Sequence, residues 1–338
     1  MTRHHRRRQP KAGPALRLRR SGLLGLVALS LGAGLAGGLV DRGAAATPTR
    51  SESQPPFAVG LRIRRLVDPT RMIRLPGGKK EPRPLVTYIR YPALGTPSES
   101  DRADAPAASS AGPFPLVVFA HGYAVTPVVY GHLLRAWARA GYVVAAPVFP
   151  LTNANAPGGP NEADLINQPT DLHVVISQLL AASDDPADPL AGLIDPARIA
   201  VAGHSDGADT ALAAAYNRHL RDPRIRAAMI FSGAEITGVR GYAFPPGSPA
   251  LLAAQGSRDK LNPPHFTTDY FDVASRPKFL LSLLRAGHLP PFTYQQPELR
   301  IVEQVTIAFL DRYLEDGSLQ ELAAAGTAPG FARLTADP

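Results

Sequence analysis

Apolar runs alternate with amphipathic segments along most of this chain. Residues 60–67 and 83–93 alternate apolar and polar positions and predict two early strands of a sheet. Further apolar runs predict buried strands within residues 114–123, 141–150, 198–207, 227–233, 249–260 and 278–288. Apolar residues at helical spacing, or rich in alanine and leucine, predict helices at 126–141, 171–182, 208–220 and 300–314. Strands that alternate with helices predict an α/β protein with a mostly parallel central sheet and helices on both faces.

The most specific local motif is GHSDG at residues 203–207, between an apolar run and the alanine-rich segment 208–220. The pattern G-x-S-x-G between a strand and a helix is a nucleophile elbow, which lifts a serine hydroxyl out of the sheet. Glycines at both ends let the two backbones approach closely, while the serine is held in a strained conformation. The motif therefore predicts Ser205 as a nucleophile.

A serine hydroxyl becomes a good nucleophile when a base takes its proton and a carboxylate orients that base. Asp259 and His288 each follow an apolar run, in the order serine, acid, histidine that this architecture uses. We therefore expect Asp259 to be the orienting acid and His288 the general base. Glu235 is the alternative acid, and His265, in a Pro-Pro loop, is the alternative base.

Acyl transfer also needs two backbone N–H groups directed at the developing oxyanion. One is expected from Asp206, which follows the nucleophile, and the other from Tyr123 in the loop after the strand at 114–120. Gly122 would let that loop approach the substrate, and the Tyr123 ring would form an apolar wall. His121 is expected to brace the loop by a hydrogen bond, and the Asp206 side chain to point away from the oxyanion.

These residues together resemble the α/β-hydrolase superfamily, in the branch of the dienelactone hydrolases, chlorophyllases, platelet-activating-factor acetylhydrolases and cutinase-like polyester hydrolases. The resemblance extends from about Leu61 to Leu314 and rests on Tyr91-Pro92, residues 121–123, the elbow, Asp259 and His288. It implies a serine-dependent carboxylic ester hydrolase without a cofactor. The segment between Ser232 and Pro249 is too short for a helical lid, so we expect no large lid, and no zinc-ligand spacing predicts a metal site. The chain departs from the polyester hydrolases in having Asp206 where they usually carry methionine, and in having no cysteine.

The first 46 residues have the pattern of a signal peptide. Residues 1–20 hold eight Lys or Arg and no acid, residues 22–40 hold no charge, and small residues follow, so cleavage is expected after Ala46. Arg19-Arg20 resembles a twin-arginine signal. Residues 47–56 then form a linker, 57–318 the catalytic domain and 319–338 a C-terminal tail. The protein is expected to be secreted; the alternative is an uncleaved anchor that holds the catalytic domain outside the membrane.

The distribution of charge argues against nucleic acid as a partner. The net charge of +8 belongs to the leader, since the rest of the chain holds 28 basic and 28 acidic residues. Nucleic acid is therefore not an expected partner, and no obligate protein partner is implied. The expected substrate is a small-molecule, lipid or polymer ester, contacted by the irregular segment 151–169. Two alternatives remain: a peptidase or amidase that uses the same triad, and a non-catalytic surface binding protein on the same fold.

Overall fold

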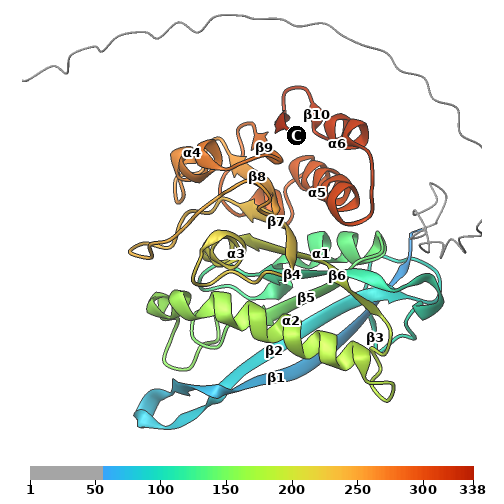
Figure 1. Ribbon diagram of the computed structural model, residues 1–338, viewed down its shortest axis with the longest axis vertical. Helices are drawn as coiled ribbons and strands as arrows, with labels where there is room; N and C mark the ends of the chain where they lie inside the picture. Colours follow the sequence, from blue (N-terminus) through green and yellow to red (C-terminus); the bar gives the residue numbers. More distant parts are fainter. Residues whose placement is uncertain (1–55) are drawn as a thin grey trace, which may run out of the picture. The chain divides into compact units, whose positions relative to one another are not determined.

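The computed structural model describes residues 56–338, in which eleven strands form one sheet with the order β10-β11-β9-β8-β7-β6-β4-β5-β2-β1-β3 (Figure 1). The strands are β1 (Ala58–Arg74), β2 (Lys80–Ala93), β3 (Arg102–Ala103), β4 (Phe114–Ala120), β5 (Val143–Val148), β6 (Ile194–His204), β7 (Ile225–Phe231), β8 (Ala250–Gly256), β9 (Lys278–Leu283), β10 (Thr327–Ala328) and β11 (Ala332–Asp337). The helices are α1 (Gly131–Arg139), α2 (Gln168–Asp184), α3 (Asp206–Tyr216), α4 (Pro264–Val273), α5 (Glu298–Leu314) and α6 (Leu319–Ala325). From β5 through β9 the central strands are parallel, as predicted.

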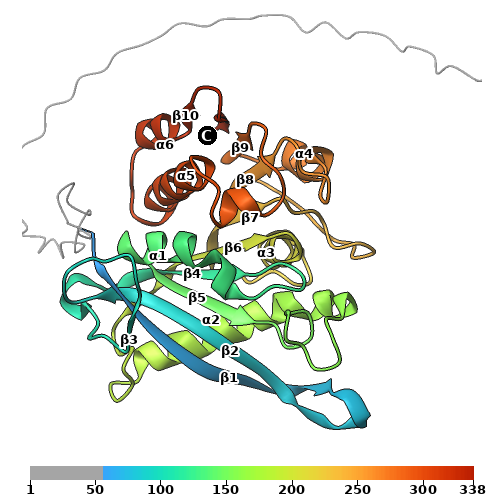
Figure 2. The same ribbon diagram turned by 180° about the vertical axis from the view of Figure 1, so that it is seen from behind.

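Two apolar layers cover the two faces of the sheet, and alternate residues of each central strand supply them. In β4, Leu116 and Val118 belong to the layer under α2, α3 and α4, whereas Val117 and Phe119 belong to the layer under α1, α5 and α6. All four side chains are fully buried. The central strands are apolar throughout because both of their faces are covered, and the arrangement can be followed from both sides in Figures 1 and 2.

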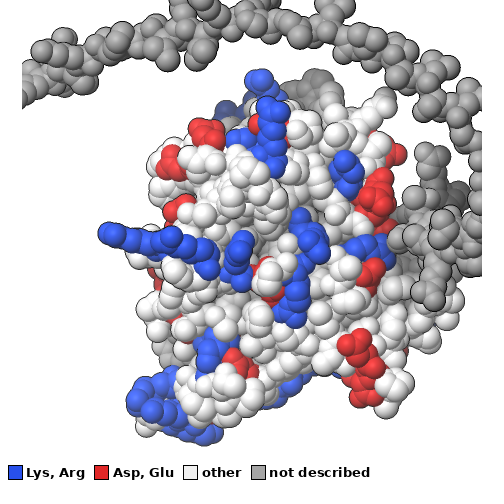
Figure 3. Space-filling model, in the orientation of Figure 1, with Lys and Arg blue, Asp and Glu red and all other residues white. Residues whose placement is uncertain are grey.

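The two early strands form a long antiparallel hairpin at one side of the sheet. Strand β1 pairs with β2 along most of its length, and β2 pairs with β5. Lys and Arg side chains gather at the end of this hairpin, where Arg74, Lys79 and Lys80 are exposed (Figure 3). The hairpin alternates between apolar and polar positions because one of its faces meets solvent.

The prediction that residues 319–338 form a tail outside the domain is wrong. Residues 319–325 form α6, which begins with a capping box between Ser318 and Glu321 and buries Leu322 completely. Strand β11 then pairs antiparallel with β9 along its whole length. The chain therefore adds a helix and two sheet strands after α5, and the domain includes β11.

The predicted signal peptide, residues 1–46, and residues 47–55 of the predicted linker lie outside the described residues. Within residues 56–338, no helix is both long and apolar enough to cross a membrane.

Candidate active site

The turn between β6 and α3 has the geometry of a nucleophile elbow. Ser205 has φ 57° and ψ −129°, a conformation that non-glycine residues rarely adopt. A Cβ on Gly203 would lie 2.0 Å from the Gly207 carbonyl oxygen, and one on Gly207 would lie 2.1 Å from the Ala120 oxygen. Both positions therefore require glycine, and the close approach holds the strained serine at the carboxyl edge of the sheet.

Asp259 and His288 meet although 29 positions separate them in the chain. His288 Nδ1 lies 2.7 Å from Asp259 Oδ2, while Asp259 Oδ1 accepts the N–H groups of Leu261 and Asn262 at 2.9 and 3.0 Å. Burial of Asp259 opposes its ionisation, but the hydrogen bonds with His288 and Asn262 outweigh that cost and lower its pKa. A charged Asp259 keeps the proton of His288 on Nδ1, so Nε2 is left free to act as a base.

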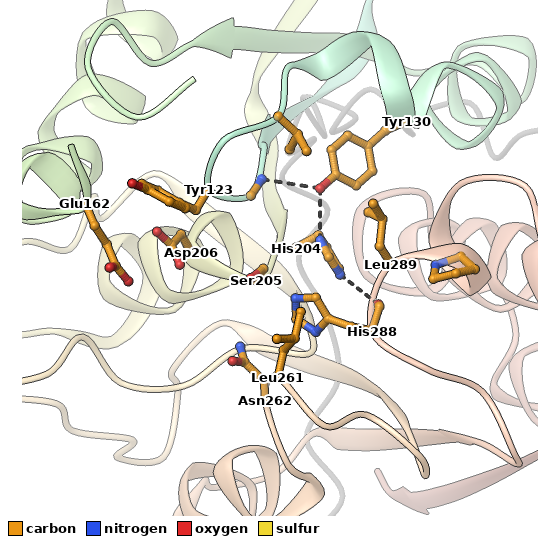
Figure 4. Close-up of a pocket in the computed structure, with 13 residues that line it drawn as sticks. Tyr123, Tyr130, Glu162, His204, Ser205, Asp206, Leu261, Asn262, His288 and Leu289 are labelled. Atoms are coloured by element: carbon orange, nitrogen blue, oxygen red, sulfur yellow. Dashed lines mark hydrogen bonds between the residues drawn. The ribbon is translucent and has the colours of Figure 1, made fainter. Parts of the chain in front are cut away.

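Ser205 and His288 line the same pocket, which has a volume of about 540 Å³ (Figure 4). The hydrogen bonds found among the described residues do not include one between these two side chains, and such contacts often tighten only when substrate binds. The rival residues lie elsewhere. His265 is exposed in the first turn of α4 rather than in a loop, with its ring against Phe266, and Glu235 is also exposed.

The loop after β4 lies against the elbow, and His121 braces it. The His121 ring is buried, with Nδ1 2.8 Å from the Gly122 carbonyl oxygen and Nε2 3.0 Å from the Phe149 nitrogen. A backbone N–H can only donate, so Nε2 accepts and Nδ1–H donates to Gly122. Burial lowers the pKa of His121 to about 4, which keeps this neutral form at neutral pH.

The hydrogen bond from His121 to the Gly122 carbonyl orients the peptide that carries the Tyr123 N–H. In a trans peptide the C=O and the following N–H point in opposite directions, so the Tyr123 N–H points away from His121. The Tyr123 ring lines the pocket, as expected, and its hydroxyl donates to the Pro160 carbonyl at 3.0 Å. Gly122 lies so close to the elbow that a Cβ there would be 3.3 Å from the Ser205 Cβ.

The sequence analysis expected the Asp206 side chain to point away from the oxyanion, but in the structure it lies in the pocket wall. Asp206 lines the pocket beside Ser205 and Tyr123 (Figure 4), and its Oδ2 is buried without a hydrogen-bond partner among residues 56–338. Burial, and then the negative charge of Glu162, raises the pKa of Asp206 to about 6. Among residues 56–338, no lysine or arginine lines this pocket to compensate the two carboxylates.

The segment 151–169 was expected to contact the substrate. Of its residues, Glu162 lines the pocket. Arg83 holds this segment in place from the hairpin, since its guanidinium binds the carboxylates of Asp164 and Asp171 at 2.6–2.9 Å. All three side chains of this ion cluster are buried. Glu162 also lines a neighbouring pocket of about 670 Å³, so the two cavities adjoin.

Two buried residues of the site were missed by the sequence analysis. Tyr130 and His204 line the pocket and are linked by a hydrogen bond of 2.9 Å. His204 occupies the variable position before the nucleophile, and Tyr130 lies in the 3₁₀ turn that precedes α1. Neither position carries a motif of its own, so only the fold shows that they meet. No cluster of three potential metal ligands occurs among the described residues.

Comparisons with known proteins agree with this architecture. Residues 102–232 match the model of the Chlorophyllase family. Among solved structures, the chain is similar to a ferulic acid esterase from Streptomyces cinnamoneus, with a TM-score of 0.61 and 22% identity over 81% of this chain and 94% of that one. No curated protein matches. The structural likeness shows the predicted α/β-hydrolase fold.

Proposed function

We propose that this chain, which has the α/β-hydrolase fold, is a secreted serine hydrolase of carboxylic esters. The observation that carries the proposal is the Asp259–His288 pair, joined at 2.7 Å in the same pocket as the strained Ser205. A buried carboxylate, an imidazole with a free Nε2 and a serine on an elbow are the parts that acyl transfer requires. The partial match to the Chlorophyllase family and the fold of the ferulic acid esterase support an ester as the substrate.

In the proposed reaction, Ser205 Oγ attacks the ester carbonyl while His288 Nε2 takes the hydroxyl proton. The C=O electron pair moves to the oxygen, and the N–H groups of Tyr123 and Asp206 stabilise the oxyanion. When the C=O bond re-forms, the bond to the alcohol oxygen breaks and His288 returns the proton to that oxygen. Water then attacks the acyl-enzyme by the same steps, which release the carboxylic acid and restore Ser205.

The cellular setting is part of the proposal. We propose that residues 1–46 are removed on export and that the enzyme acts outside the cell on small-molecule, lipid or polymer esters. The near balance of basic and acidic residues after position 20 supports neither nucleic acid nor another polyanion as a partner.

The test is hydrolysis of p-nitrophenyl esters from acetate to palmitate by residues 47–338 and by the Ser205→Ala variant. We expect the parent to hydrolyse at least one ester and the variant to lose that activity. The chain-length optimum would then give the size of the acyl site. Equal rates for parent and variant, or no rate for either, would overturn the proposal. An anilide series under the same conditions separates ester from amide hydrolysis.

A further inference from the structure

A buried chain of hydrogen bonds joins the loop that carries Tyr123 to the loop that carries the base. The Gly122 N–H lies 3.3 Å from the Tyr130 hydroxyl, which lies 2.9 Å from His204 Nδ1. His204 Nε2 lies 2.9 Å from the carbonyl oxygen of His288. Figure 4 shows the three links in series, with His204 between the two loops.

The direction of every bond in this chain is determined by its two ends. The His288 carbonyl can only accept, so His204 Nε2 carries a proton. Burial lowers the pKa of His204 to about 3, so the ring is neutral and its Nδ1 accepts from the Tyr130 O–H. The Tyr130 oxygen is then free to accept the Gly122 N–H. Tyr130 is fully buried and His204 is 2% exposed, so water does not compete for these bonds.

We propose that Tyr130 and His204 are positioning residues. They hold the loop of Tyr123 and the loop of His288 at the spacing that the transition state needs. This inference rests on the proposed function. In the transition state, negative charge develops on the substrate oxygen that faces the Tyr123 N–H, while positive charge develops on His288. Both loops must therefore be aligned at the same moment. His121 fixes the C=O of Gly122 and Tyr130 fixes its N–H, and the chain therefore extends this support to His288.

The first variant is Tyr130→Phe, which removes the hydroxyl and keeps the ring against Phe119, 4.7 Å away. We expect kcat for p-nitrophenyl butyrate to fall about 10- to 100-fold, as for a small misplacement of reacting groups, while KM changes less than about threefold. Affinity for an alkylboronic acid, which forms a tetrahedral adduct with the serine, should fall together with kcat/KM. Labelling of Ser205 by a fluorophosphonate should still reach one per chain.

The matched control is Tyr216→Phe. Tyr216 is 3% exposed and its hydroxyl donates to the Pro249 carbonyl at 3.0 Å, outside the pocket. Tyr130→Phe loses the hydrogen bonds with Gly122 and His204. Tyr216→Phe loses those to the carbonyls of Pro249 and Ala250. Both variants should therefore unfold at a lower temperature, but only Tyr130→Phe should lose kcat. If Tyr130→Phe does not fold, His204→Asn breaks the same chain and is judged by the same criteria.

The outcomes separate the two proposals. An unchanged kcat in Tyr130→Phe, a loss confined to KM, or an unchanged boronic acid affinity would overturn the positioning role while ester hydrolysis stands. A parent protein without esterase activity, or without labelling at Ser205, would overturn the proposed function and this inference with it. In the double variant Tyr130→Phe/His204→Asn, we expect kcat to fall no further than in the more severe single variant, because the hydrogen-bond chain acts as one unit.

Discussion

At the residue scale, the carboxylate of Asp206 works against the oxyanion that its own N–H would stabilise. Two like charges about 5 Å apart repel by about 3 kcal/mol at an effective dielectric constant of 20, and solvent at the pocket mouth reduces this value. Asp206 is ionised only above its raised pKa of about 6. Its charge should therefore penalise the reaction at neutral and alkaline pH and not at acidic pH.

We predict that Asp206→Asn increases kcat/KM for neutral esters about three- to tenfold at pH 8 and leaves it nearly unchanged at pH 5. The measurement is the pH dependence of kcat/KM for parent and variant. As a control, a choline ester should gain less than its uncharged 3,3-dimethylbutyl analogue, because its cation is attracted by the carboxylate. A gain that does not depend on pH would show that the effect is steric.

The same pKa has a consequence for stability. Since the folded-state pKa lies above the ordinary value of 3.8, the folded protein binds this proton more tightly than the unfolded chain. The free energy of unfolding therefore loses a contribution as the pH rises from about 4 to about 6. Asp206→Asn should raise Tm at pH 8 and not at pH 4, which thermal unfolding at the two pH values would show.

Asp259 is expected to act by fixing the tautomer of His288. We predict that Asp259→Asn lowers kcat about 10³- to 10⁴-fold, because an amide donor in place of the carboxylate favours the wrong tautomer. KM should change little. Glu235→Gln is the control and should retain the activity of the parent, since Glu235 is exposed. Similar losses in the two variants would contradict the assignment of the acid.

The residues with a motif or an order along the chain could be predicted from the sequence, and those with neither could not. Ser205, Asp259 and His288 were found because each follows an apolar run, and the structure places Asp259 and His288 in contact. Tyr130 and Glu162 each lie in a short 3₁₀ turn, and such turns have no periodic pattern in the sequence. The orientation of Asp206 depends on the packing around it, which single-sequence reasoning does not describe.

At the element scale, the central strands were predictable because they are buried on both faces and read as continuous apolar runs. Strand β4 begins at the predicted residue, and α3 (206–216) overlaps most of the predicted helix 208–220. Helix α4 was missed because its start, at Pro264, follows another proline and resembles a loop. Strand β11 was missed because its short, polar sequence forms a strand only through the hydrogen bonds that β9 supplies.

The pairing of β11 with β9 gives a prediction for the C-terminal segment. Removal of residues 319–338 exposes the edge of β9 and the apolar surface that Leu322 covers. We expect the free energy of unfolding to fall by about 3 kcal/mol or more, and esterase activity to fall with it, because β9 leads into the loop of His288. Denaturant unfolding of the truncated and full chains measures this difference.

A point variant separates the helix from the strand. Leu322→Ala in the full chain should cost about 2–5 kcal/mol, as for other fully buried leucines, and leave the pairing of β11 intact. If the truncated chain unfolded at the same denaturant concentration as the parent, residues 319–338 would be dispensable and the pairing with β9 would add no stability.

At the scale of the whole molecule, access to the pocket determines how a substrate binds. Residues 232–249, where a lid would have to lie after β7, form no helix. Two residues of the pocket wall are themselves open to solvent, since Leu261 is 72% and Tyr123 39% exposed. Within residues 56–338, an ester can therefore reach Ser205 without displacement of a covering helix, and this part of the chain has no apolar lid that would open at a lipid interface.

We therefore predict that the rate rises smoothly with substrate concentration through the solubility limit of a short-chain triglyceride. A lid that opens at an interface would instead produce a steep increase above that limit, because the interface would stabilise the open state. The measurement is the initial rate on tributyrin from dilute solution to emulsion, with a lipase that has a helical lid as the positive control. A steep increase in the rate of this protein, comparable to that of the control, would mean that a segment such as the loop that carries Leu261 closes over the pocket in solution.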